Sequence, residues 1–266
     1  MENEKRKQIT YAVLALVILC AALAFGLGQM EDSSEEIPEA QPLEATFTED
    51  AEGDGAEVMD SEIPEAYTME SFPIILQIPE LPTGCEVTAL TMVLQYYGFD
   101  VEKTTMAAEY LPTVDEMFYY GEDGTLYGTD LQQYFIGNPF TEDGVVCGTG
   151  AIVTAADTYL NDQGSDMQAI DLTGSSPEEL YGLVSQDIPV IVWVTIGMAD
   201  REVNGSWYTE DGTYIDWSTS DHGAVLIGYS EDLVTIADPI SGETEYDREQ
   251  FESVFESRSC QCVILE

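Results

Sequence analysis

The sequence predicts an α+β fold, with helices in the first part of a folded domain and antiparallel strands in the second. Apolar residues recur at helical spacing across residues 83–97. After residue 186, short runs rich in Val, Ile, Trp and Tyr alternate with turn residues, as is typical of strands joined by hairpins. The 266 residues are enough for one such domain, expected at residues 69–266, preceded by an N-terminal extension.

The N-terminal segment, residues 1–28, predicts a signal-anchor helix. A basic cluster at residues 5–7 precedes an uncharged stretch whose apolar part runs over residues 9–27. That length can cross a bilayer, and the basic cluster favours the cytoplasmic side. A cleaved signal peptide is the alternative, with residues 22–24 as the cleavage site. Either way, we expect the remainder on the extracytoplasmic side, tethered to the cell membrane or secreted.

Residues 29–68 predict an acidic, disordered linker. Glu, Asp, Pro, Ser and Ala dominate this segment, and large apolar residues are sparse. Such a composition buries too little apolar surface to offset the entropy lost on ordering. We therefore expect a spacer between the membrane and the folded domain.

The charge of the chain limits its partners. It contains 52 acidic and 7 basic residues, for a formal net charge of −45. Binding to nucleic acid is excluded because phosphate contacts need basic patches. Docking on an anionic lipid surface is disfavoured for the same reason. Two readings of the acidity stay open, namely surface solubility and a preference for neutral or basic substrates.

The clearest predicted helix spans residues 83–97. Thr83 and Glu86 have the spacing of a capping box, and Gly98 is a typical C-terminal stop. This helix places Cys85 in its first turn. Free backbone N–H groups and the helix dipole at that position favour a thiolate, so Cys85 is a candidate nucleophile.

The middle of the chain predicts further helices over residues 101–110, 130–135 and 150–160. A short helix follows, with Ser176 as its cap and Pro177 in its first turn. The aromatic segments between these helices are expected to be loops: residues 119–121, 127–128 and 137–140.

The last third of the chain predicts a buried strand at residues 189–194. Two hairpins follow, the first turning at residues 210–212 and the second around Ser230. We then expect a capped helix over residues 247–256 and a final strand over residues 261–265.

His222 is the only histidine in the chain, so imidazole chemistry near neutral pH must use it. It follows Cys85 by 137 positions (222 − 85). If the second hairpin is symmetric about Ser230, His222 lies directly opposite Asp238, with Cβ atoms about 4.5–5.5 Å apart. Asp238 then orients the imidazole ring. Asp221, the neighbour of His222 on an extended chain, is expected to point to the other face.

Gln77, eight residues before Cys85, is a candidate oxyanion donor together with the Cys85 backbone N–H. One histidine and no Cys-x-x-Cys give a zinc site poor ligand support, so we expect no metal and no cofactor. Cys260 and Cys262 are expected to share one face of the last strand. A disulfide from either to Cys147 stays open, as do simple buried thiols.

The motifs resemble those of the C39-like cysteine peptidases, a branch of the papain-like fold. The resemblance spans residues 73–264 and is carried by residues 77–86, 137–140, 191–194, 222–229 and 238–242. It implies Cys85 as nucleophile, His222 as general base and acid, Asp238 as orienting residue and Gln77 in the oxyanion hole. The best-known C39 peptidases are joined to ABC transporters and remove double-glycine leaders. No transporter lies within these residues, so that substrate is not carried over.

The sequence thus predicts a membrane-tethered, exported cysteine peptidase that hydrolyses the amide bonds of a peptide or protein through an acyl-enzyme. One alternative is a cell-wall peptide amidase or endopeptidase. The separation of Cys85 and His222 argues against the NlpC/P60 type, in which the two usually lie much closer. The other alternative is a catalytically silent peptide-binding or adhesion module on the same fold.

Overall fold

A computed structural model describes residues 63–115 and 117–266. The expected anchor at 1–28, and the expected linker up to residue 62, lie outside the described residues. Residues 67 and 68, before the expected boundary at residue 69, also belong to the fold, because Tyr67–Thr68 form strand β1, antiparallel to a long strand near Tyr229. Within the described part of the chain, no helix has the length and apolarity needed to span a membrane.

A seven-stranded sheet organises the fold, in the order β12-β11-β10-β7-β13-β6, with β1 added beside β10. All its neighbouring strands are antiparallel. The central strands β7 and β10 are buried along their whole length, and each therefore contains an uninterrupted apolar run, at residues 190–194 and 224–227. The strands are β6 (Ala169–Asp171), β7 (Val190–Thr195), β10 (Asp221–Tyr229), β11 (Leu233–Asp238), β12 (Gly242–Asp247) and β13 (Cys262–Leu265).

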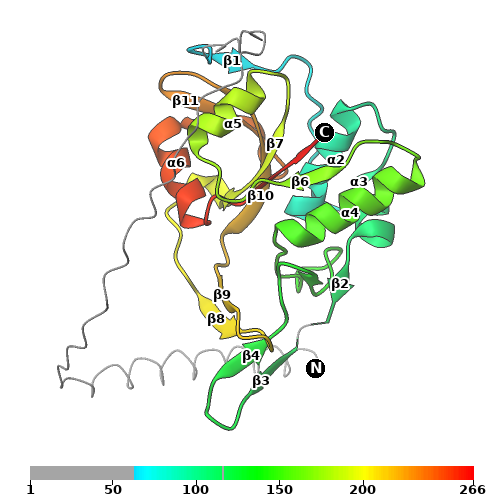
Figure 1. The fold of residues 1–266 in the computed structure, drawn as a ribbon, viewed down its shortest axis with the longest axis vertical. Helices are drawn as coiled ribbons and strands as arrows, with labels where there is room; N and C mark the ends of the chain where they lie inside the picture. The colour runs from blue at the N-terminus through cyan, green and yellow to red at the C-terminus, as the bar shows by residue number, and fades with distance from the viewer. Residues whose placement is uncertain (1–62, 116) are drawn as a thin grey trace, which may run out of the picture. The chain divides into compact units, whose positions relative to one another are not determined.

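Helices pack on both sides of this sheet, with α2 and α4 on one side and α5 and α6 on the other (Figure 1). The helices are α2 (Cys85–Tyr96), α3 (Lys103–Thr105) continued by the π-helical turn η1 (Met106–Tyr110), α4 (Thr149–Asp162), α5 (Pro177–Val184), the 3₁₀ turn η2 (Ile196–Met198) and α6 (Arg248–Ser257). The mixed helix and strand content that the sequence predicts is confirmed.

Two predicted helix caps are confirmed. The Ser176 hydroxyl accepts a hydrogen bond from the Glu179 N–H at the start of α5, and the Glu179 carboxylate accepts one from the Ser176 N–H. The Asp247 carboxylate accepts a bond from the Gln250 N–H at the start of α6. Each satisfies a backbone donor that the first helical turn leaves free.

The predicted capping box at Thr83 and Glu86 is wrong. The residue before α2 is Gly84, and no side chain caps this helix. The Thr83 hydroxyl donates instead to the Thr141 carbonyl oxygen at 3.0 Å. The Glu86 side chain is fully buried. Thr83 cannot cap the helix because its hydroxyl is engaged by the loop that follows Asn138.

The predicted helix over residues 130–135 is also wrong. The Asp130 carboxylate accepts a bond from the Gln132 N–H and shapes a turn. The chain then enters β5 (Phe135–Ile136), which pairs in parallel with β2 (Thr113–Val114). This local hydrogen bond between the Asp130 side chain and the backbone competes with the hydrogen bonds of a helix, as is typical of Asp.

A second, four-stranded sheet lies at one end of the domain, in the order β3-β4-β8-β9 (Figure 1). Its strands are β3 (Phe118–Tyr120), β4 (Leu126–Gly128), β8 (Gly205–Tyr208) and β9 (Tyr214–Trp217). The hairpin of β8 and β9 is confirmed. The aromatic segments of β3 and β4, expected as loops, are strands because they extend this hairpin.

The four cysteines in the described part of the chain are free thiols: Cys85, Cys147, Cys260 and Cys262. Cys260 has a positive φ of 52° and lies before β13, which begins at Cys262. The expectation that both lie on one face of the last strand is therefore wrong.

Candidate active site

Cys85 is the first residue of α2, after a tight turn through Gly84. A Cβ atom on Gly84 would lie 2.9 Å from the Leu81 Cβ, so the turn requires glycine. The helix then packs against β10, where a Cβ atom on Gly223 would lie 2.8 Å from the Glu86 Cα. This close approach brings the first turn of α2 against the residue that follows His222.

His222 and Asp238 form a buried pair. The His222 Nε2 lies 3.1 Å from the Asp238 Oδ1, and the two residues are 1% and 4% exposed. The predicted direct opposition is wrong, because Val225 pairs with Ala237 and the register is shifted by two positions. An even shift keeps both side chains on the same face, since side-chain direction alternates along a strand. The pair therefore forms between diagonal neighbours.

Asp238 is held as a carboxylate. Its Oδ1 accepts hydrogen bonds from the backbone N–H groups of Ile240 at 2.6 Å and Ser241 at 3.2 Å. Burial disfavours the charge, but the hydrogen bond and charge of His222 and these N–H groups hold the Asp238 pKa below its ordinary value. An ionised carboxylate can only accept, so Nε2 carries the hydrogen and Nδ1 remains available as a base.

The Cys85 sulfur is almost covered, with 8% of the residue exposed. Burial raises the pKa of the Cys85 thiol well above its ordinary value, and the Glu86 charge raises it further. The Gly223 and Glu86 backbone N–H groups oppose this shift. Desolvation thus exceeds the effect of the N–H groups at the helix start, which favours the neutral thiol in this structure.

Gln77 lies between the segments that carry Cys85 and Asp238. Its backbone N–H donates to the Pro239 carbonyl oxygen at 2.7 Å, and its Nε2 donates to the Pro82 carbonyl oxygen at 2.9 Å. The residue is 3% exposed, and its Oε1 has no hydrogen-bond partner. Nε2 carries two hydrogens, so one remains for a further acceptor.

Glu86 is a titratable group of the site that the sequence analysis assigns only to a cap. It is completely buried, and neither carboxylate oxygen has a hydrogen-bond partner. Burial raises the pKa of Glu86 to about 7. Four nearby groups lower this pKa by a smaller amount, namely its own N–H, the Cys85 thiol, the charge of His222 and the Cys147 N–H. An acidic residue inside an otherwise apolar helix was the sequence signal for this position.

Asp221 points away from this pair, as the sequence predicts, and binds two arginines. Arg201 donates to both of its carboxylate oxygens, at 2.8 and 3.1 Å, and Arg258 Nη1 lies 3.1 Å from Oδ2. All three side chains are nearly covered. The sequence analysis missed the two arginines, since nothing in their local patterns indicates that they share one carboxylate.

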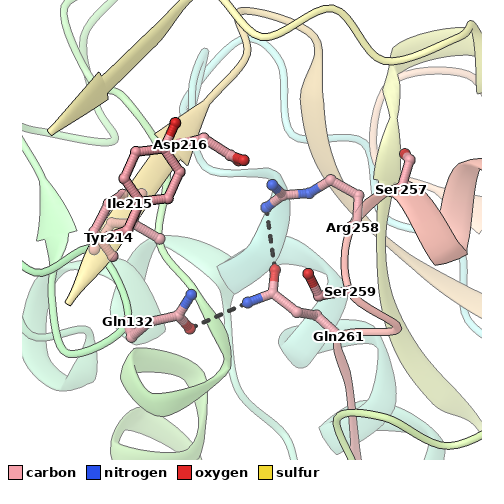
Figure 2. Close-up of a pocket in the computed structure, with 9 residues that line it drawn as sticks. Gln132, Tyr214, Ile215, Asp216, Ser257, Arg258, Ser259 and Gln261 are labelled. Carbon is pink, nitrogen blue, oxygen red and sulfur yellow. Dashed lines mark hydrogen bonds between the residues drawn. The ribbon is translucent and has the colours of Figure 1, made fainter. Parts of the chain in front are cut away.

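A cavity of about 210 Å³ adjoins this cluster (Figure 2). Arg258 Nη2 donates to the Gln261 Oε1 at 3.1 Å, and Gln261 Nε2 donates to the Gln132 Oε1 at 3.2 Å. The guanidinium and the amides thus form one bonded wall, and Tyr214 and Asp216 lie across from it (Figure 2). The cavity is therefore one ion pair away from the residue that precedes His222.

Residues 69–263 match the model of the Peptidase_C39 like family. A Bacillus subtilis (strain 168) protein described as "Uncharacterized protein YvpB" is 29% identical over 256 residues, which cover 94% of this chain and 96% of that protein. A crystal structure of a candidate C39-like peptidase from Bacillus anthracis matches with a TM-score of 0.66 and 31% identity, covering 76% of this chain and 98% of that one. These matches confirm the resemblance carried by the sequence motifs. The chain belongs to the Peptidase_C39 like family.

Proposed function

We propose that this protein is a cysteine peptidase of papain-like fold that hydrolyses peptide bonds through a Cys85-His222-Asp238 triad. The hydrogen bond between His222 Nε2 and Asp238 Oδ1, at 3.1 Å, carries the proposal. This bond fixes the ring so that Nδ1 is the free nitrogen. The next residue along the chain, Gly223, has a backbone N–H that favours the thiolate form of Cys85. A buried carboxylate that orients an imidazole supports nucleophilic acyl transfer, and the proposal places the Cys85 thiol within reach of Nδ1.

In this mechanism, His222 Nδ1 takes the proton of the Cys85 thiol and the sulfur attacks the substrate carbonyl carbon. The Cys85 N–H and the second Nε2 hydrogen of Gln77 stabilise the oxyanion. His222 then donates its proton to the leaving amine, and the acyl group stays on Cys85 as a thioester. A water molecule that gives a proton to His222 attacks the thioester, which releases the acid and restores the thiol.

The burial of the thiol determines when the nucleophile forms. Because burial raises the pKa of Cys85 well above its ordinary value, the resting enzyme holds a neutral thiol. Proton transfer produces an ion pair, and Asp238 stabilises its imidazolium partner. We therefore propose that thiolate formation accompanies substrate binding and does not precede it.

The N-terminal sequence supports an extracytoplasmic location. An apolar stretch over residues 9–27 behind a basic cluster has the features of a signal-anchor. The proposed enzyme is thus tethered to the cell membrane by this segment, or secreted if the segment is cleaved. Its substrate is a peptide or protein outside the cytoplasm, cell-wall peptides included.

Hydrolysis of a peptide library by the full-length chain tests the proposal. We expect Cys85→Ala and His222→Ala to lower kcat/KM by about a thousandfold or more. Cys260→Ala, which removes a half-buried thiol outside the site, is the matched control and should retain activity. Full activity of Cys85→Ala would exclude the mechanism.

Two further outcomes separate the alternatives. Peptide binding without turnover by the wild-type chain would indicate a catalytically silent peptide-binding or adhesion module. Release of peptides from purified cell wall, lost in Cys85→Ala and absent with library peptides, would indicate a cell-wall amidase or endopeptidase.

A further inference from the structure

Four tyrosines form a continuous row across the small sheet. Tyr119 of β3 pairs with Tyr127 of β4, Tyr127 pairs with Tyr208 of β8, and Tyr208 pairs with Tyr214 of β9. Register partners on neighbouring strands point to the same face of a sheet. Each strand therefore contributes one ring to the same face, and we call this row the tyrosine ladder.

The ladder faces solvent. Tyr119, Tyr208 and Tyr214 are 46%, 40% and 54% exposed. Their rings are ordered against one another: Tyr119 stacks on Tyr127 with centroids 5.5 Å apart, and Tyr208 meets Tyr214 edge-on at 5.3 Å. The ladder thus presents aromatic faces that the described part of the chain does not cover.

The opposite face of the same sheet supplies the packing. Phe118 and Trp207, each adjacent in sequence to a ladder tyrosine, meet edge-on at 5.1 Å. Trp207 and Ile215 belong to a small buried cluster under this sheet. The sheet is therefore held by its inner face, and the tyrosines are not needed to fill a core.

The charge around the ladder is negative. The two hairpin turns of the sheet carry Glu122 and Asp123, and Glu210 and Asp211. Asp216 shares the face of Tyr214 on β9, but Arg201 pairs with it at 2.6 Å, so the net negative charge of the surface comes from the turn carboxylates. The strands and turns of the sheet contain no Lys, Arg or His, and none occurs from Thr104 to Asp200. A cationic ligand complements this surface, whereas an anionic one is repelled.

One end of the ladder lies at the cavity beside the ion pairs of Asp221. Tyr214 and Asp216 line the cavity of Figure 2 together with Arg258. Arg258 is paired with Asp221, which directly precedes His222. The ladder is therefore connected to β10, the strand that carries His222, through this cavity and the Arg258–Asp221 ion pair.

We infer that the tyrosine ladder is a substrate-binding surface for peptides that carry Lys or Arg side chains. Ammonium and guanidinium groups bind the faces of tyrosine rings, and the flanking carboxylates add long-range attraction. The inference rests on the proposed peptidase function and assigns its substrate class as cationic peptides.

The test measures binding separately from cleavage. The full-length chain carrying Cys85→Ala is titrated with a fluorescent Gly/Ser peptide that contains lysines, and with the same peptide after lysine acetylation. We expect the acetylated peptide to bind more weakly, and the lysine peptide to weaken as salt is raised. Failure of the proposed catalysis leaves this assay unaffected, so the two proposals can fail independently.

Variants locate the surface. The double change Tyr119→Ala and Tyr208→Ala should weaken binding about tenfold, from about twofold to fivefold per exposed ring. Tyr208→Phe keeps the ring face and should keep the affinity. Tyr120→Ala is the matched control, because Tyr120 is 60% exposed on the same strand but adjacent to Tyr119, so it points to the other face.

Two results would overturn the inference. One is equal binding of the lysine and acetylated peptides, which needs no variant and so does not depend on how the variants fold. The other concerns a neutral oligosaccharide titrated in the same way. If the double variant loses oligosaccharide binding but binds the lysine peptide as tightly as before, the tyrosine ladder is a glycan-binding surface.

Discussion

The buried carboxylate of Glu86 should lower the stability of the protein as pH rises. Its pKa is raised from 4.5 to about 7 because burial penalises the charged form. The folded state therefore holds this proton more tightly than the unfolded state does. The stability that Glu86 contributes is fully present below its unfolded pKa and is lost as pH rises through the folded pKa.

The size of the effect follows from the shift. One pKa unit corresponds to about 1.4 kcal/mol, so the full shift is worth about 3 kcal/mol. Most of it, roughly 2–3 kcal/mol, is lost between about pH 5 and about pH 8. Glu86→Gln cannot ionise, so the free energy of unfolding of the variant should rise by this amount relative to wild type across the same range.

Urea denaturation of both proteins over a pH series measures this difference. Comparing the two curves cancels the other carboxylates, which titrate alike in both. Glu243→Gln, at an exposed position of β12, is the matched control and should track wild type at every pH. A constant difference between Glu86→Gln and wild type would refute the reasoning, because it would mean that Glu86 ionises as easily in the fold as in the unfolded chain.

Three other predictions concern contacts of the site. Gly223→Ala places a Cβ atom 2.8 Å from the Glu86 Cα and should lower the stability measured by thermal unfolding by about 1–3 kcal/mol. Gly205→Ala is the control and should be tolerated, because its Cβ atom meets only Trp217, at 3.7 Å. Equal stability of the two variants would contradict the close approach of α2 and β10. Asp221→Ala leaves Arg201 and Arg258 buried without their shared partner and should lower the free energy of unfolding by about 3–5 kcal/mol. Asp216→Ala should lower it less, because the Asp216 carboxylate is partly exposed. A larger loss of stability in Asp216→Ala than in Asp221→Ala would be inconsistent with the shared ion pair. Asp238→Ala frees the imidazole ring and should lower kcat about 10–100-fold with little change in KM. Asp232→Ala, in an exposed turn, is the control and should keep the wild-type kcat. An unchanged kcat in Asp238→Ala would show that Asp238 does not orient His222.

The strands and the His222–Asp238 pair could be predicted from local patterns. Continuous apolar runs identify β7 and β10 because both faces of those strands are covered. The exact register could not be predicted, since an irregularity between Leu226 and Gly228 shifts the pairing within the hairpin. The face survives this error because side chains alternate along a strand, so the two residues still meet.

The rest depends on contacts between distant segments. Phe118–Tyr120 and Leu126–Gly128 have no strong strand pattern of their own. They become strands by pairing with each other, and the second of them pairs with β8. Thr83 loses its capping role to a bond with Thr141, far away in sequence. The burial of the Cys85 thiol likewise could not be predicted. A helix start favours an accessible thiolate, and the burial depends on how β10 packs against that helix.

Labelling with a peptide that carries a C-terminal thiol-reactive electrophile tests the central claim most directly, with the modified residue located by peptide mass spectrometry. The account predicts a label on Cys85, none on Cys147, Cys260 or Cys262, and loss of the Cys85 label in His222→Ala. Labelling of Cys85 that is indifferent to His222, or a label confined to Cys260, would contradict it.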